Sequence, residues 1–139
     1  VYTLHGDGEL QEGQIWEAAM YAAAKKIDNL ISTVDVNAKQ IDGSTDDVLP
    51  MGSIQAKFEA FGWHVISVAK GNDLSAVKQA LIEATAASGN GKPVCILLHT
   101  EMGNGVDFMM GTHKWHGVAP NDDQLADALR QNPETLGDY

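Results

Sequence analysis

The feature that most constrains the fold is a regular alternation of short apolar segments with segments of helical character. Four apolar segments read as strands, at residues 1–4, 30–36, 63–68 and 94–99. Helical patterns separate them, at residues 14–26, at 53–61, and from Asn72 or Asp73 to Ser88. Nearly continuous apolar strands between helices are typical of a parallel sheet that is covered on both faces. We therefore expect an α/β fold with a parallel sheet and helices on both faces.

Several details of this prediction can be tested against a structure. The helix at 14–26 is apolar nearly all round, so we expect it to be buried on more than one side. Residues 37–50 are expected to form a polar loop, and Gly62 to end the preceding helix in a left-handed conformation. A last helix is expected from residues 120–122 through Leu129.

Composition excludes some classes of function. The chain has 139 residues, enough for one domain, and carries nine basic and nineteen acidic residues, for a net charge of −10. Nucleic acids and anionic membranes require clustered basic residues, so we expect neither as a partner. Any phosphate group bound by this chain would have to be held locally, by backbone amides, a helix end or a metal ion.

The single cysteine and the first residues bear on location and completeness. Cys95 lies inside an apolar run, where we expect a buried, inert thiol of the kind found in the reducing cytoplasm. No apolar stretch approaches the length of about 18 residues that a membrane span needs. Because Val1 opens directly on a strand, we expect the fold to lack its N-terminal part here.

The polar residues that could carry chemistry follow two of the predicted strands. Gly6-Asp7-Gly8 ends the first strand just ahead of a helix, and Asn37 follows the second strand. Backbone amides near a helix start suit a phosphate, but Asp7 would repel it unless a cation lay between them. Magnesium takes about six oxygens, often including phosphate oxygens, and the carbonyl of Lys39 could add one more. The alternative is a plain turn followed by a loop asparagine.

These segments resemble a known family. "GDGELQEG" with "WEAA", followed by "NLISTVDVNAKQIDG", is similar to the diphosphate motif of thiamine diphosphate enzymes, which pairs Gly-Asp-Gly with an asparagine about thirty residues later. "QIDG", "FEAFGWHVISV" and "THKWHGVAPND" resemble transketolases, and above all the N-terminal section of split bacterial transketolases. The resemblance covers nearly all of residues 1–139. It implies one partial diphosphate-binding domain of the thiamine diphosphate-binding fold.

The resemblance also implies ligands for a cofactor. Asp7, the Asn37 side chain and the Lys39 carbonyl would coordinate Mg²⁺. Gly6 and Gly8 would let the backbone approach the diphosphate of thiamine diphosphate, since glycine permits positive φ and close contact.

Two further residues take roles that the resemblance implies. His116 would lie beside the diphosphate and the reacting carbons of the sugar, and Glu12 would link two active sites across a subunit interface. The alternative for Glu12 is a carboxylate that caps the following helix. The sequence departs from split relatives at Met102, where they often carry a lysine near the diphosphate.

The implied reaction is the transfer of a two-carbon ketol unit from a ketose phosphate to an aldose phosphate. The family has further residues upstream that act on the sugar, and its cofactor-activating glutamate belongs to a separate pyrimidine-binding domain. We therefore expect the partner to be a C-terminal pyrimidine-binding transketolase subunit in a homo- or hetero-oligomer, and we expect no activity from this chain alone. The alternatives are 1-deoxyxylulose-5-phosphate synthase, a 2-oxo acid dehydrogenase component, and a non-catalytic remnant that serves as a binding module.

Overall fold

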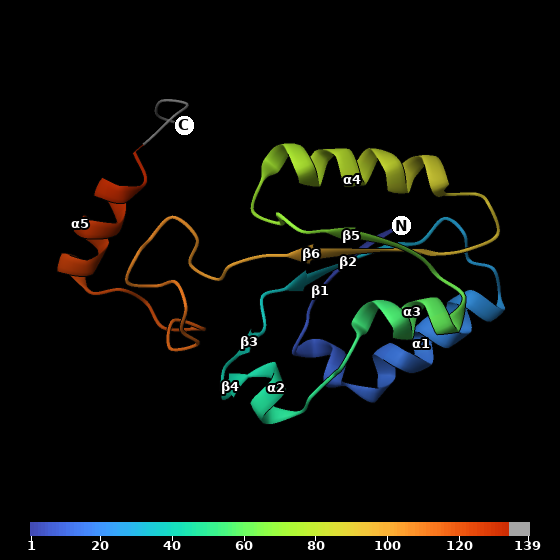
Figure 1. Cartoon of the computed structure of the whole chain (residues 1–139), viewed down its shortest axis with the longest axis horizontal. Coiled ribbons are helices and arrows are strands. Elements are labelled where there is room, and N and C mark those ends of the chain that lie inside the picture. The colour runs from blue at the N-terminus through green and yellow to red at the C-terminus, as the bar shows by residue number, and fades with distance from the viewer. Residues whose placement is uncertain (134–139) are drawn as a thin grey trace.

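A four-stranded parallel sheet organises the computed structural model, which describes residues 1–133 (Figure 1). Its strands are β1 (Tyr2–Gly6), β2 (Ile31–Val36), β5 (His64–Val68) and β6 (Val94–His99), in the spatial order β1-β2-β6-β5. All three neighbouring pairs are parallel. The strand segments predicted from the sequence are therefore confirmed.

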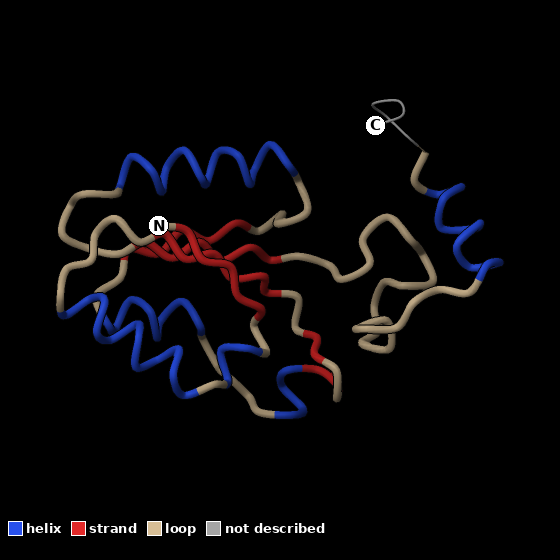
Figure 2. Tube along the Cα trace, turned by 180° about the vertical axis from the view of Figure 1, so that it is seen from behind, coloured by secondary structure: helices blue, strands red, loops and turns tan. Residues whose placement is uncertain are grey.

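Helices cover both faces of this sheet, as predicted (Figures 1 and 2). α4 (Leu74–Ala87) lies on one face, and α1 (Gly13–Ala24) and α3 (Ile54–Phe61) lie on the other. Ser53 caps α3, Asp73 caps α4, and Gly62 ends α3 with φ of 97°, as expected for a left-handed cap. The last helix, α5 (Asp122–Gln131), has Asn121 as its N-cap and lies beyond the carboxyl end of the sheet.

The core consists of two apolar layers, one on each face of the sheet. The layer under α1 and α3 includes Leu10, Ala19, Val34, Phe58, Trp63 and Leu97. The layer under α4 includes Ile66, Ala80, Ala84, Val94 and Ile96. Cys95 is fully buried, and burial raises the pKa of its thiol to about 12, so the thiol is protonated and inert as predicted. Among the described residues, no helix is both long and apolar enough to cross a membrane.

Two of the predictions on local structure are wrong. Residues 37–50 are not only a loop, since they contain the hairpin of β3 (Lys39–Gln40) and β4 (Gly43–Ser44) and the short helix α2 (Thr45–Val48). These elements are too short to give a periodic pattern in the sequence. A 3-10 helix, η1 (Glu9–Gln11), also precedes α1.

The second error concerns α1, which is buried on one side only. Ala19 and Ala22 are buried against the sheet, but Met20 and Tyr21 are 55% and 59% exposed. The apolar residues around the helix are therefore not all covered by the described part of the chain.

Candidate functional site

The ends of β1 and β2 hold a buried carboxylate, that of Asp7, which is only 2% exposed. One oxygen accepts a hydrogen bond from the amide of Gly8 at 2.8 Å, and the other accepts one from the amide of Ala38 at 2.6 Å. Burial raises the pKa of the Asp7 carboxyl above its usual 3.8, and the nearby charge of Asp35 raises it further. Hydrogen bonds from the amides of Ala38, Gly8 and Asn37 oppose this rise. The carboxylate is thus fixed in place and short of positive charge.

The segment after β2 brings an amide side chain to the same edge of the sheet. The Oδ1 atom of Asn37 accepts a hydrogen bond from the amide of Lys39 at 2.8 Å, and its Nδ2 donates to Asp35 at 3.0 Å. Between them, Ala38 has φ of 59°, in the left-handed region that non-glycine residues rarely adopt. This turn points the Ala38 amide at Asp7 and the Lys39 amide at Asn37. The strain therefore accompanies a local arrangement that links the two predicted metal ligands.

One hollow of about 420 Å³ joins the predicted cofactor-binding and metal-binding residues. It is lined by Gly6, Asp7, Gly8, Glu9, Asp35, Asn37, Lys39, Gln40, Ile41, Asp42 and His116. The structure thus brings six of the seven predicted site residues together, because the carboxyl ends of parallel strands meet at one edge of the sheet.

The charges around this hollow fit a bridging cation. Four of its lining residues carry carboxylates and only one, Lys39, carries an ammonium group. A diphosphate would be repelled by that lining unless a divalent ion lay between them. Gln40 adds a buried Oε1 atom with no hydrogen-bond partner among the described residues, which is an acceptor for whatever enters. The donor set of carboxylate, amide oxygen and backbone carbonyl is the type that Mg²⁺ prefers.

The two glycines of the turn provide space rather than an unusual backbone. Gly8 has φ of −63°, and Gly6 is not among the glycines with positive φ, so the expected use of positive φ is wrong for both. A Cβ on Gly8 would lie 3.1 Å from the Cβ of Gln40, whereas one on Gly6 would meet no atom within 4 Å. Gly8 therefore leaves room for a neighbouring side chain, and Gly6 keeps part of the hollow open.

This difference makes Gly6→Ala a test of the hollow that leaves the fold intact. The added methyl group meets no protein atom, so we expect the free energy of unfolding to change by less than about 0.5 kcal/mol. Binding of thiamine diphosphate with Mg²⁺ is expected to weaken by about tenfold or more, because the methyl group projects where the diphosphate would approach. Calorimetry and thermal unfolding measure the two effects. Unchanged binding would show that the ligand does not approach Gly6.

His116 reaches the hollow from the long segment that follows β6. Its amide donates to the carbonyl of His113 at 2.9 Å. The adjacent Trp115 donates its indole N–H to the carbonyl of Phe108 at 2.9 Å, and the two rings meet edge-on with centroids 5.3 Å apart. These contacts fix the backbone that carries His116, whose side chain is exposed.

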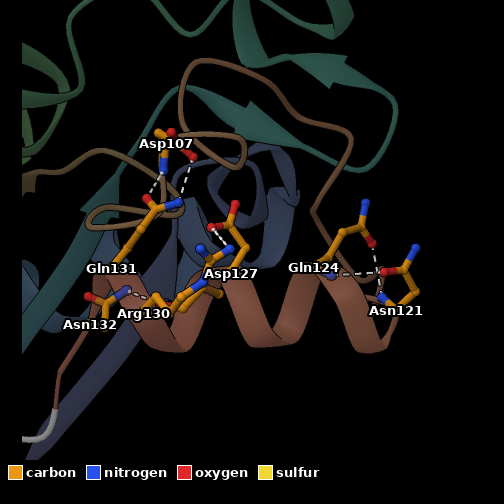
Figure 3. Close-up of polar contacts among 8 residues, drawn as sticks. Asp107, Asn121, Gln124, Asp127, Arg130, Gln131 and Asn132 are labelled. Carbon is orange, nitrogen blue, oxygen red and sulfur yellow. Dashed lines mark hydrogen bonds and ion pairs between the residues drawn. The ribbon is translucent and has the colours of Figure 1, made fainter.

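The C-terminal end of α5 holds the same segment (Figure 3). Gln131 donates its Nε2 to the carboxylate of Asp107 at 2.8 Å and accepts the Asp107 amide through Oε1, also at 2.8 Å. Asn132 donates to the carbonyl of Gly105 at 3.1 Å. Through these three hydrogen bonds, α5 braces the segment on which His116 lies.

Glu12 lies apart from the hollow. It occupies the N-cap position of α1, is exposed, and makes no side-chain capping hydrogen bond. The alternative of a capping side chain is therefore wrong. The proposed link between active sites requires a second subunit, so it stays a prediction.

Other candidate residues point elsewhere. His5 contacts Glu9 and Thr3 and lines an apolar cavity beside α1, while His99 contacts Ser67. Met102 lines a neighbouring hollow that also includes Asn37 and Thr100. Within residues 1–133, no three His, Cys, Asp or Glu side chains gather in the manner of a metal site built from those residues alone.

The sequence reasoning missed Asp35 and Gln40. Asp35 could have been found, because residues two apart on a strand face the same way and Asn37 directly follows this strand. Gln40 gave no such signal, since its place depends on the unexpected hairpin of β3 and β4.

The raised pKa of Asp7 predicts how ion binding depends on pH. The proton competes with a metal ion for the carboxylate, so affinity is lost as pH falls through the raised pKa and is fully present above it. We expect the affinity for Mn²⁺, a substitute for Mg²⁺, to rise with pH over a range that lies above 3.8 and then level off. Titrations followed by electron paramagnetic resonance would measure this, with circular dichroism to verify folding. An affinity that is constant down to about pH 4 would contradict the assignment of Asp7.

Comparisons with known proteins agree with the geometry of the site. Residues 1–134 match the family described as "Transketolase, thiamine diphosphate binding domain". The 6-deoxy-6-sulfo-D-fructose transketolase subunit SqwG of Clostridium sp. (strain MSTE9) is 43% identical over 118 residues, covering 85% of this chain and 42% of the relative. One of the subunits of the apulose-4-phosphate transketolase of Phocaeicola vulgatus is 37% identical over 137 residues, covering 97% and 47%.

Solved structures give the same result for the fold. Transketolase from Leishmania mexicana is 35% identical and superposes with a TM-score of 0.85, covering 94% of this chain and 19% of that one. Transketolase from Campylobacter jejuni is 32% identical with a TM-score of 0.82, covering 94% and 20%. The chain thus spans less than half the length of the two subunits it matches and about a fifth of the full-length enzymes. With its sheet, its diphosphate motif and the family match over residues 1–134, the chain belongs to the transketolase family, as part of the thiamine diphosphate-binding domain.

Proposed function

We propose that this chain is the part of a split transketolase that binds thiamine diphosphate and Mg²⁺, and that it acts with a pyrimidine-binding partner subunit. The observation that carries the proposal is the hollow shared by Asp7, Asn37, Lys39 and His116 at the carboxyl edge of the sheet. The reaction would be the transfer of a two-carbon ketol unit between sugar phosphates. The two relatives are named for different sugars, so the proposal does not specify the donor and the acceptor.

The roles of the individual residues follow from their positions. The Asp7 carboxylate, the Asn37 amide oxygen and the Lys39 carbonyl would hold the metal ion, which would neutralise the diphosphate against the acidic lining. Gly6 would leave room for the phosphate groups. Thiamine diphosphate, when bound, supplies the carbanion that attacks the donor carbonyl.

His116 would act on the oxygens of the bound groups. It is exposed at the rim of the hollow, on a segment braced by Trp115 and α5. From there its imidazole can donate a hydrogen bond to a phosphate or sugar oxygen, or carry a proton between them. Glu12 would contribute through a second subunit.

A partner subunit is part of the proposal. Both relatives are named as subunits, and the exposed apolar residues of α1, Met20 and Tyr21, leave surface that the described chain does not cover. The pyrimidine-binding subunit would complete the cofactor site. The buried thiol of Cys95 suits the proposed cytoplasmic location.

Reconstitution tests this function. The purified protein, its partner subunit, thiamine diphosphate and Mg²⁺ would be incubated with a panel of ketose phosphates and aldose phosphates, and products would be identified by mass spectrometry. We expect an aldose phosphate extended by two carbons, and no product from this protein alone. Release of CO₂ from a 2-oxo acid would instead indicate another thiamine diphosphate enzyme. If the cofactor does not bind even with the partner present, the chain is a non-catalytic binding module.

A further inference from the structure

We propose that Asp35 is a positioning residue, which fixes the Asn37 side chain so that its oxygen, rather than its NH₂ group, is available to the metal ion. This inference rests on the proposed function, because it concerns how the chain prepares one ligand of that ion.

Asp35 connects the ends of two strands. One carboxylate oxygen accepts a hydrogen bond from the hydroxyl of Thr100, directly after β6, and the other accepts one from Nδ2 of Asn37 at 3.0 Å. The backbone amide of Thr100 donates to the carbonyl of Val36 at 3.2 Å, which holds Thr100 beside β2. Both oxygens of Asp35 are therefore occupied, and it reaches the hollow's chemistry through Asn37.

The polarity of these contacts determines the orientation of the Asn37 amide. An ionised carboxylate can only accept, so Asn37 turns its NH₂ group toward Asp35. Its Oδ1 then lies 2.8 Å from the donating amide of Lys39. The reversed amide would place oxygen against carboxylate and NH₂ against N–H, which are two repulsive contacts. Since Mg²⁺ binds oxygen, this orientation decides whether Asn37 can serve as a ligand.

The Asp35→Asn variant removes the fixed polarity while keeping the shape. The Thr100 hydroxyl has no other acceptor among the described residues, so it keeps donating to the oxygen of the new side chain. The new NH₂ group then faces the NH₂ group of Asn37, which must rotate and present nitrogen to the ion. We expect the affinity for Mn²⁺ to fall by about tenfold or more, the size of effect seen when a residue that orients a metal ligand is replaced.

The double variant Asp35→Asn/Asn37→Asp distinguishes orientation from a general structural role. The new amide at position 35 can donate to the new carboxylate at position 37, which keeps an oxygen toward Lys39 and the ion. Net charge is the same as in the wild type. We expect the double variant to recover Mn²⁺ affinity to within about threefold of the wild-type protein, whereas damage to the fold would not be repaired by a second substitution.

Titration of the purified protein with Mn²⁺, followed by electron paramagnetic resonance, gives the dissociation constants without requiring turnover. Asp46→Asn is the matched control, because it removes the same charge from the exposed surface of α2, outside the hollow. The inference is overturned if Asp35→Asn binds as tightly as Asp46→Asn, or if the double variant stays as weak as the single one. If Asp35→Asn does not fold, the double variant alone decides, and a loss of more than tenfold there overturns the inference. If the wild-type protein itself binds no ion with thiamine diphosphate present, the proposed function fails, and the inference fails with it.

Discussion

The Asp7→Ala variant is expected to lose Mg²⁺-dependent binding of thiamine diphosphate by at least about a hundredfold. Asp7 is the buried carboxylate among the predicted ligands, and both of its oxygens are held in place by backbone amides. Without it, the ion would keep only neutral ligands from the protein. The diphosphate would then meet the remaining carboxylates of the hollow without a bound charge to offset them.

Isothermal titration calorimetry, with and without Mg²⁺, measures this loss. Asp46→Ala removes the same charge from an exposed position of α2 and is expected to bind within about twofold of the wild-type protein. If Asp7→Ala keeps metal-dependent binding, the ion lies elsewhere and the assignment of the hollow is wrong.

The largest expected effect on stability belongs to Phe58→Ala. Phe58 is 2% exposed and lies between two indole rings, with centroid distances of 5.3 Å to Trp16 and 5.2 Å to Trp63. Its truncation leaves a cavity where α1 and α3 pack on the sheet. We expect the free energy of unfolding to fall by about 3–5 kcal/mol.

Urea unfolding tests this value, with the midpoint expected to shift at constant slope. Leu129→Ala is the control, because Leu129 is 62% exposed on α5 and should change stability by less than about 0.5 kcal/mol. A loss below about 1 kcal/mol for Phe58→Ala would mean that the aromatic layer tolerates a cavity, contrary to its close packing.

The sheet was predictable from the sequence because buried parallel strands leave a strong pattern. The run from Val94 to His99 is apolar at nearly every position, and the structure places it as a central strand between β2 and β5. The strand order could not be obtained in this way, since the sequence shows which strands are buried on both faces but not which neighbours they pair with. The exposed side of α1 was missed for a related reason, because apolar residues predict burial without saying which chain provides it.

The site was predictable to the extent that it depends on strand ends. Asp7 and Asn37 directly follow neighbouring parallel strands, so topology alone brings them together. His116 is different, because its position depends on a long segment held by side-chain contacts such as that between Gln131 and Asp107. Such contacts leave no periodic signal, and only the family resemblance indicated that His116 reaches the hollow.

The most direct test of the central claim is a crystal structure of the protein with Mn²⁺ and thiamine diphosphate, with the ion located by its anomalous scattering. The account predicts one peak at about 2.0–2.3 Å from the Asp7 carboxylate, the Asn37 amide oxygen and the Lys39 carbonyl, with diphosphate oxygens completing its coordination. A peak that contacts neither Asp7 nor Asn37, or a diphosphate bound outside their shared hollow, would contradict it.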